Sequence, residues 1–167
     1  MLKDRSIFRG SKSPSRKICE ERYAHMIKKS DNPTVIQSQR KRLISEAESS
    51  AQHAYAPYSR FRVGAAVLAA SGEIYRGANI ENASYGLGIC AERVALAAAK
   101  VAGEERLVAI AVACVDAASD SPLEQKLPCG ACLQWIQELA PEAHIFVSGE
   151  KKSFRLPDLL PHAFRLA

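Results

Sequence analysis

The sequence predicts an α/β fold with three layers, α/β/α, in which helices cover both faces of a mixed, roughly five-stranded sheet. Apolar stretches of strand length alternate along the chain with longer stretches of helical periodicity. Predicted helices connect consecutive predicted strands, and right-handed crossovers of this kind place helices on the two faces of one sheet. At 167 residues the chain is long enough for one domain with a real core.

Residues 1–34 are expected to be a basic, disordered extension ahead of a folded domain at residues 35–167. The whole chain has a formal net charge of +5, but the charge is unevenly distributed. Residues 1–42 contain 12 Lys or Arg and 4 Asp or Glu, whereas the rest of the chain contains 11 Lys or Arg and 14 Asp or Glu. The folded part is therefore mildly acidic, and we expect neither a nucleic-acid nor a membrane partner. Five cysteines, three of them at metal-ligand spacing, favour a reducing compartment and a cytoplasmic location.

The first half of the domain is predicted to be a helix followed by a β-hairpin. We expect the helix to run from Thr34 to about Ala54, with Thr34 as N-cap and Gln37 completing a capping box. Strands are predicted at residues 61–70 and 73–80, joined by a tight turn at Ser71 and Gly72.

The second half is predicted to alternate between helices and strands. The expected elements are a helix from Cys90 to near Gly103, an inner strand at 107–115, a helix at 129–139, strands at 143–148 and 152–156, and a helical turn at 157–160.

Two short motifs carry the chemistry: Cys90-Ala91-Glu92-Arg93, and Pro128-Cys129-Gly130-Ala131-Cys132. Three thiolates suit Zn²⁺ and leave one coordination position open for water. Both motifs are predicted to start helices, and helix N-termini lower the pKa of a thiol. The carboxylate of Glu92, two residues from a ligand, can shuttle protons without binding the metal. We therefore predict one Zn²⁺ per chain, held by Cys90, Cys129 and Cys132.

Two other interpretations of the cysteines remain. A Cys-x-x-Cys pair also occurs in redox proteins and in structural zinc sites. A structural site needs a fourth Cys or His, and none lies at ligand spacing from either motif. The combination of Cys-Ala-Glu with a later Pro-Cys-x-x-Cys is more specific, and it is typical of zinc-dependent nucleobase deaminases.

The chain resembles cytidine deaminases of the short, homotetrameric type with three zinc-binding cysteines. The resemblance covers roughly residues 36–167 and includes both cysteine motifs. The other matching segments are residues 55–59, 61–66, 77–83 and 159–164.

The resemblance implies an activity: hydrolytic deamination of cytidine or deoxycytidine to uridine or deoxyuridine, with release of ammonia, as in pyrimidine salvage. A zinc-bound hydroxide would attack C4, and Glu92 would shuttle the protons. The resemblance also implies a homotetramer whose active sites are completed by neighbouring chains.

The same resemblance assigns residues to the site. It implies that Cys90, Cys129 and Cys132 bind zinc and that Arg93 hydrogen-bonds to their sulfurs. For the substrate, it implies that Asn79 and Glu81 hold a ribose hydroxyl, that Phe61 packs on the pyrimidine, and that the Ala91 N–H donates to the base carbonyl. It also implies that Tyr85 and Phe164 line the shared pocket.

Two departures from the family pattern concern the surroundings of the site. Leu133 stands where the family usually has Arg, and the loop at residues 117–127 is long. The alternatives are a deaminase of another aminated nucleoside or nucleoside antibiotic, and a non-catalytic zinc-binding protein. Glu92 argues against the last, because a structural metal site needs no adjacent carboxylate.

Overall fold

The computed structural model describes residues 32–166, so most of the predicted basic extension lies outside the described residues. The elements are α2 (Pro33–Ala51), β1 (Val63–Ala69), β2 (Ile74–Ala78), η1 (Tyr85–Leu87), α3 (Ala91–Val101), β3 (Leu107–Cys114), η2 (Leu123–Gln125), α4 (Gly130–Leu139), β4 (His144–Val147), β5 (Ser153–Phe154) and α5 (Leu156–Leu159). Within residues 32–166 no helix is long and apolar enough to cross a membrane.

The five strands form one mixed sheet in the order β2-β1-β3-β4-β5, as the sequence predicted for strand number and type. β1 pairs antiparallel with β2 and with β3, and β4 pairs antiparallel with β5. β3 and β4 are parallel and are connected through α4. This connection brings the end of β3 and the start of α4, which carries two of the cysteines, to one end of the sheet.

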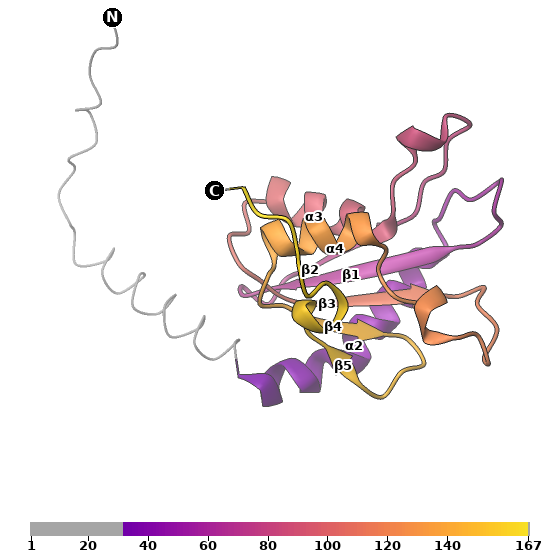
Figure 1. Cartoon of the computed structure of the whole chain (residues 1–167). Coiled ribbons are helices and arrows are strands. Elements are labelled where there is room, and N and C mark those ends of the chain that lie inside the picture. Colours follow the sequence, from indigo (N-terminus) through magenta and orange to yellow (C-terminus); the bar gives the residue numbers. More distant parts are fainter. Residues whose placement is uncertain (1–31, 167) are drawn as a thin grey trace, which may run out of the picture.

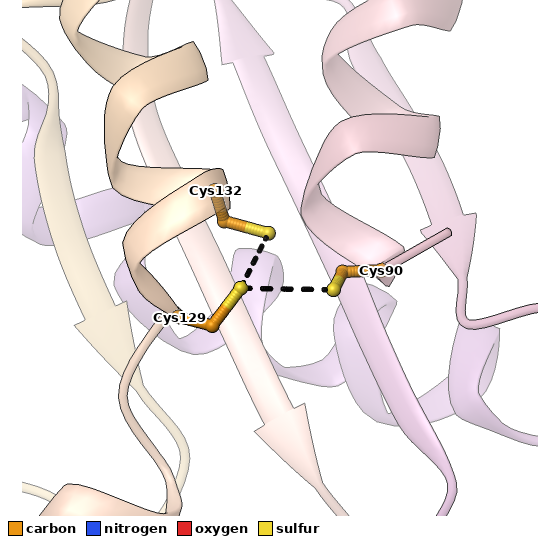
Figure 2. Close-up of side chains that lie close together, drawn as sticks. All are labelled: Cys90, Cys129 and Cys132. Carbon is orange, nitrogen blue, oxygen red and sulfur yellow. Dashed lines mark hydrogen bonds between the residues drawn. The ribbon is translucent and has the colours of Figure 1, made fainter. Parts of the chain in front are cut away.

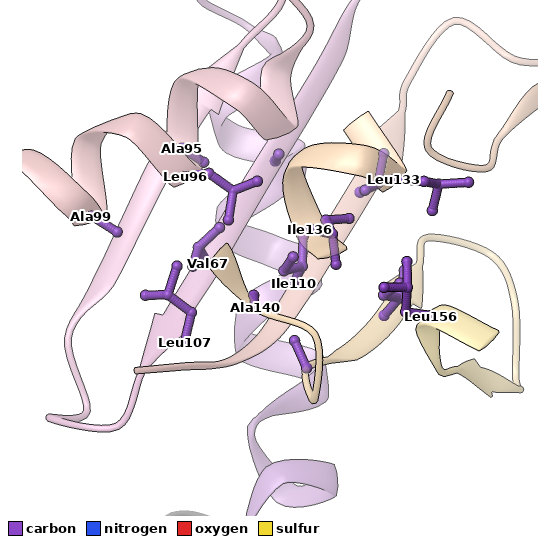
Figure 3. Packing of buried hydrophobic residues seen from close by; sticks show 14 of the residues in the cluster. Val67, Ala95, Leu96, Ala99, Leu107, Ile110, Leu133, Ile136, Ala140 and Leu156 are labelled. Atoms are coloured by element: carbon purple, nitrogen blue, oxygen red, sulfur yellow. The ribbon is translucent and has the colours of Figure 1, made fainter. Parts of the chain in front are cut away.

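Helices cover both faces of the sheet, which confirms the three-layer prediction (Figure 1). The strands are buried on both sides: in β1, Ala66 and Leu68 belong to the core cluster beneath α2, whereas Ala65 and Val67 belong to the cluster beneath α3 and α4. Figure 3 shows the second cluster, with Leu96 of α3 and Ile136 of α4 above strand side chains such as Val67.

Two glycines let the helices lie close against the sheet. A Cβ atom at Gly64 of β1 would lie 1.9 Å from the carbonyl oxygen of Ala47 in α2. A Cβ atom at Gly77 of β2 would lie 2.3 Å from the carbonyl oxygen of Ala91 and 2.5 Å from the amide nitrogen of Ala95, both in α3. The backbone at the start of α3 therefore rests directly on Gly77.

The predicted start and end of the first helix are wrong. Asn32 is the N-cap: its side-chain oxygen accepts a hydrogen bond from the Thr34 amide at 2.9 Å, and the helix ends at Ala51. Thr34 is already inside the helix because Pro33 supplies the first helical position, where a missing N–H costs nothing. The predicted strands at 61–70 and 73–80 are each shorter than expected, since Phe61, Asn79 and their neighbours form the loops of the site.

Candidate active site

The three motif cysteines meet at the facing starts of α3 and α4, as the sequence predicted (Figure 2). Cys90 is the N-cap of α3 and Cys129 is the N-cap of α4, while Cys132 lies in the first turn of α4. Neither cap side chain accepts a hydrogen bond from a backbone N–H of its own helix. Both sulfurs at the caps are therefore free to turn toward each other, in the partial positive charge of two helix N-termini.

The spacing of the sulfurs fits a zinc ion. The Sγ atoms of Cys90 and Cys129 lie 3.8 Å apart, those of Cys129 and Cys132 lie 3.6 Å apart, and all three lie within 4.8 Å of one another. Tetrahedral zinc with Zn–S bonds of about 2.3 Å requires ligand sulfurs about 3.8 Å apart. Cys90, Cys129 and Cys132 can therefore hold Zn²⁺ with little rearrangement, and three protein ligands leave one position open.

Arg93 places a positive charge beside the ligand group. Its Nη2 atom donates to the Sγ of Cys90 at 3.7 Å and to the carbonyl oxygen of Gly88 at 3.3 Å. The neighbouring Cys132 thiol and the Arg93 guanidinium lower the pKa of Cys90 to about 5, which favours the thiolate. Cys114 differs: burial raises its pKa to about 11, so it remains a neutral thiol at the edge of the site.

Glu92 is a buried acid next to the metal ligands. It is the second residue of α3 and is 4% exposed, although it carries a carboxyl group. Burial raises the pKa of Glu92 to about 7, with the negative charge of Cys90 adding to the effect. A carboxyl group with a pKa near neutrality can both accept and donate a proton at physiological pH.

These groups line a cavity of about 410 Å³ at the end of the sheet. Of the predicted site residues, the structure brings Phe61, Asn79, Glu81, Tyr85, Cys90, Glu92, Arg93 and Cys129 into its lining. The lining also contains residues that the sequence analysis did not assign: Val63, Ile80, Gly88, Ile89, Val112, Cys114, Gln125 and Leu127. The residue types of these eight carry no signal of a site. Five of them lie within two residues of an assigned one in the sequence, and the fold adds Val112, Cys114 and Gln125. A larger hollow of about 510 Å³ lies elsewhere, and its lining contains no cysteine.

Asn79 organises the loop that carries Phe61. Its side-chain oxygen accepts a hydrogen bond from the Val63 amide at 2.8 Å, and its side-chain nitrogen donates to the Phe61 carbonyl at 2.9 Å. A carboxamide nitrogen has two hydrogens, so one N–H of Asn79 remains for a ligand. Asn79 thus holds the Phe61 backbone at the cavity. This structural role comes in addition to the contact with a ribose hydroxyl that is predicted for Asn79.

Glu81 is held as a carboxylate at the mouth of the cavity. Its Oε2 atom accepts hydrogen bonds from the amides of Tyr58 at 2.9 Å and Ser59 at 3.2 Å. The Ser59 side chain, and then these two amides, lower the pKa of Glu81. A carboxylate can accept further hydrogen bonds, and this one is positioned to accept one from a hydroxyl group in the cavity.

The remaining predicted site residues lie at the edge of the cavity or outside it. Tyr85 is 82% exposed and its ring meets that of Tyr58 edge-on, with 6.3 Å between the ring centroids. Ala91 is fully buried as the first residue of α3. Phe164 is 70% exposed and does not line the cavity of its own chain; its carbonyl oxygen accepts a hydrogen bond from the side chain of Gln134 at 2.9 Å.

The fold and this site define a class of protein. A three-layer α/β domain that brings three cysteine sulfurs together at zinc spacing, next to a buried carboxyl group and an open cavity, has the parts of a zinc-dependent hydrolytic enzyme.

Comparisons with known proteins identify the family. The model of the family described as "Cytidine and deoxycytidylate deaminase zinc-binding region" matches residues 37–148. A cytidine deaminase of Halalkalibacterium halodurans is 46% identical over 129 residues, which are 75% of this chain and 93% of that protein. The crystal structure of the cytidine deaminase from Burkholderia pseudomallei has a TM-score of 0.66 at 42% identity and covers 74% of this chain and 98% of its own.

A second solved structure agrees. The cytidine deaminase from Mycobacterium tuberculosis has a TM-score of 0.64 at 38% identity and covers 75% of this chain and 97% of its own. The chain belongs to the cytidine deaminase family, and it is a zinc-dependent hydrolytic enzyme.

Proposed function

We propose that the protein hydrolyses cytidine and deoxycytidine to uridine and deoxyuridine with release of ammonia. The observation that carries the proposal is the buried carboxyl group of Glu92 beside three thiolates that fit zinc. Zinc bound by these thiolates supplies a Lewis acid that lowers the pKa of a water molecule toward neutrality. A non-catalytic zinc-binding protein has no use for such a carboxyl group, and burying it costs stability.

Glu92 is the proton carrier of the proposed reaction. It accepts a proton from the attacking water and delivers it to N3 of the pyrimidine, so that C4 becomes open to attack. After the oxygen has added to C4, Glu92 takes the remaining proton of the new hydroxyl group and passes it to the amino group. The C4–N bond then breaks, ammonia departs, and the C4 carbonyl of the uracil forms. Its pKa of about 7 lets one side chain serve as base and then as acid. The Ala91 amide, at the start of the same helix, is the proposed donor to the C2 carbonyl.

The charges around the cavity favour a nucleoside over a free base or a nucleotide. Glu81 and the remaining N–H of Asn79 offer an acceptor and a donor for ribose hydroxyls, which a free base lacks. Among the described residues that line the cavity and the adjoining hollow at Tyr58 and Asn82, Arg93 is the one cation, and it is committed to Cys90 and Gly88. A 5′-phosphate would therefore meet the Glu81 carboxylate with no positive charge assigned to it. Phe61 is the proposed stacking partner of the base.

We further propose that the chain acts as a homotetramer with shared active sites. Large apolar side chains are exposed at the cavity and beside it: Ile80 and Tyr85 line the cavity, and Tyr58 lines the adjoining hollow. Exposed apolar surface of this kind is typical of an interface between subunits. Phe164 lies outside its own cavity, which supports a role in the cavity of a neighbouring chain, where it would close the site against water.

The proposed cellular role is pyrimidine salvage in the cytoplasm. Free thiols at Cys90, Cys114, Cys129 and Cys132 suit a reducing compartment, because an oxidising one would join the close pairs as disulfides and displace the metal.

An ultraviolet assay on the zinc-loaded protein tests the function. Cytidine, deoxycytidine, cytosine and cytidine monophosphate are compared at equal concentration, and ammonia release is measured in parallel. We expect both nucleosides to be converted at comparable kcat/KM and the other two compounds to be at least 100-fold poorer. Conversion of cytosine as fast as cytidine would contradict the roles of Asn79 and Glu81, and no conversion of any compound would contradict the activity itself.

A further inference from the structure

The long loop between β3 and α4 brings two side chains into the cavity that the proposed reaction does not use. Gln125, at the end of η2, and Leu127, two residues before Cys129, both line the cavity. This loop and the loop carrying η1 project from the same end of the sheet (Figure 1). The cavity lining includes residues of both loops, and Gln125 and Leu127 form the part of its wall that comes from the loop between β3 and α4.

The three anchors of the proposed function determine which part of a substrate meets this wall. The ribose lies at Asn79 and Glu81, C4 lies at the cysteine group, and N3 faces Glu92 at the start of α3. A pyrimidine has two edges between its ribose nitrogen and C4. Since the edge with C2 and N3 faces α3, the edge with C5 and C6 is left for lining that does not belong to α3, and Gln125 and Leu127 of the loop between β3 and α4 are part of that lining.

Contacts with the rest of the domain hold the segment that carries Gln125 and Leu127 in place. Lys126, between the two wall residues, forms an ion pair with Glu150 at 2.7 Å, and the Lys126 side chain is only 13% exposed. The amides of Lys126 and Leu127 both donate to the carbonyl oxygen of Leu123, at 2.8 and 3.1 Å. The side chains of Leu123 and Leu127 pack against the core cluster beneath α3 and α4. A wall anchored in this way resists displacement by a bulkier ligand.

We propose that Gln125 and Leu127 are specificity-determining residues that face C5 of the pyrimidine and select against cytidines substituted at that carbon. The inference rests on the proposed function and extends it from the class of reaction to the choice among cytosine nucleosides. Leu127 supplies an apolar surface at the substituent, and Gln125 supplies a carboxamide at the open side of the wall. A single methyl group against a rigid apolar surface is worth roughly 10–200-fold in kcat/KM.

The test compares kcat/KM for 5-methylcytidine with kcat/KM for cytidine in the same zinc-loaded preparation. The variants are Leu127→Ala, which opens the wall, Leu127→Phe, which extends it, and Gln125→Ala. Glu124→Ala is the matched control, because Glu124 is exposed in the same short helix and does not line the cavity. We expect the ratio of kcat/KM for 5-methylcytidine to kcat/KM for cytidine to rise at least tenfold in Leu127→Ala and to fall at least tenfold in Leu127→Phe. The same ratio should rise at least threefold in Gln125→Ala and be unchanged in Glu124→Ala.

Zinc content and thermal unfolding show whether each variant is folded. If Leu127→Ala does not fold, Leu127→Val replaces it, with an expected threefold rise in the ratio. Ratios within twofold of the parent in folded Leu127 and Gln125 variants would overturn the proposal while the cytidine assay of the parent still supported the function. A parent protein inactive on cytidine would instead refute the function on which the proposal rests.

Discussion

At the scale of single residues, the site depends on which of its cysteines face one another. Cys90, Cys129 and Cys132 approach within ligand spacing, whereas Cys114 lines the same cavity as a neutral, half-buried thiol. The distinction is made by the two helix starts, which bring the three sulfurs together, whereas Cys114 ends a strand and is not in this group.

Replacement of one ligand should therefore differ sharply from replacement of the neighbouring thiol. Cys129→Ala is expected to lose zinc and about 3 kcal/mol of stability, because a bound metal stabilises the state that binds it. Cys114→Ala is the matched control and should retain one zinc per chain. Zinc analysis and thermal unfolding of the two purified variants check this. Stoichiometric zinc in Cys129→Ala, or zinc loss in Cys114→Ala, would show that the ligand set is wrong.

Arg60 is the residue at which the loop carrying Phe61 is strained. It has a φ of 56°, in the left-handed region that side chains other than glycine rarely adopt, and its amide donates to the Ala56 carbonyl at 3.1 Å. Arg60→Gly is expected to change stability by less than about 1 kcal/mol, because relief of strain offsets the added freedom of the unfolded chain.

Arg60→Val should instead destabilise by about 2 kcal/mol, since a β-branched residue is poorly accommodated in that conformation. Urea unfolding of both variants measures the difference. Equal stability of the Gly and Val variants would mean that the loop does not require the left-handed conformation.

At the scale of elements, the position of α3 links the core to the chemistry. The first turn of α3 carries Glu92 and Arg93, its cap is Cys90, and its backbone rests on Gly77 of β2. No side chain fits between β2 and this turn, so any shift of the helix moves Cys90 and Glu92 together, relative to the two cysteines of α4.

Gly77→Ala should consequently affect both stability and metal binding. The added methyl would lie 2.3 Å from the Ala91 carbonyl oxygen, so α3 has to move, at a cost of about 1–3 kcal/mol. We expect a lower unfolding temperature and zinc affinity reduced at least tenfold in a chelator competition. Gly86→Ala is the control, because a methyl at Gly86 meets nothing within 4 Å. Parent-like zinc affinity in Gly77→Ala would contradict the dependence of the site on this contact.

The elements also show what sequence patterns can and cannot predict. The periodicity of apolar residues predicted the helix–strand alternation, and the two cysteine motifs predicted the two helix starts that meet at the site. The N-cap at Asn32 was missed because Thr34 offered an equally good local signal, and only the position of Pro33 decides between them. The residue types of Val112, Gln125 and Leu127 carry no signal of a site: β3 brings Val112 to the cavity, and the conformation of the loop before Cys129 turns Gln125 and Leu127 into its lining.

At the scale of the whole molecule, the described C-terminal residues do not line the cavity of their own chain. Phe164 is held near α4 by the hydrogen bond from Gln134 and stays outside that cavity. The aromatic side chains of Tyr58 and Tyr85, near the mouth of the cavity, are exposed. Both features favour an assembly in which subunits exchange their C-terminal segments.

Subunit mixing tests this assembly. A chain lacking residues 164–167 and a Glu92→Ala chain are each expected to have little activity. After subunit exchange, mixed tetramers should regain part of the parent activity, because one subunit contributes Phe164 and the other contributes Glu92. Each variant mixed with itself is the control. No rescue between subunits shown to exchange, or an active monomer in light scattering, would rule out shared sites.

The measurement that tests the central claim most directly is the rate of cytidine conversion by Glu92→Gln at a known zinc content. The amide keeps the shape of the carboxyl group but neither gains nor loses a proton near neutral pH. Glu92 is not in the group of possible metal ligands, so the substitution leaves that group intact. The account predicts one zinc per chain, unfolding at a temperature close to that of the parent, and a kcat reduced by about 10²–10⁴. Parent-like kcat with bound zinc would contradict the role of Glu92, and loss of zinc together with activity would mean that Glu92 serves the metal site itself.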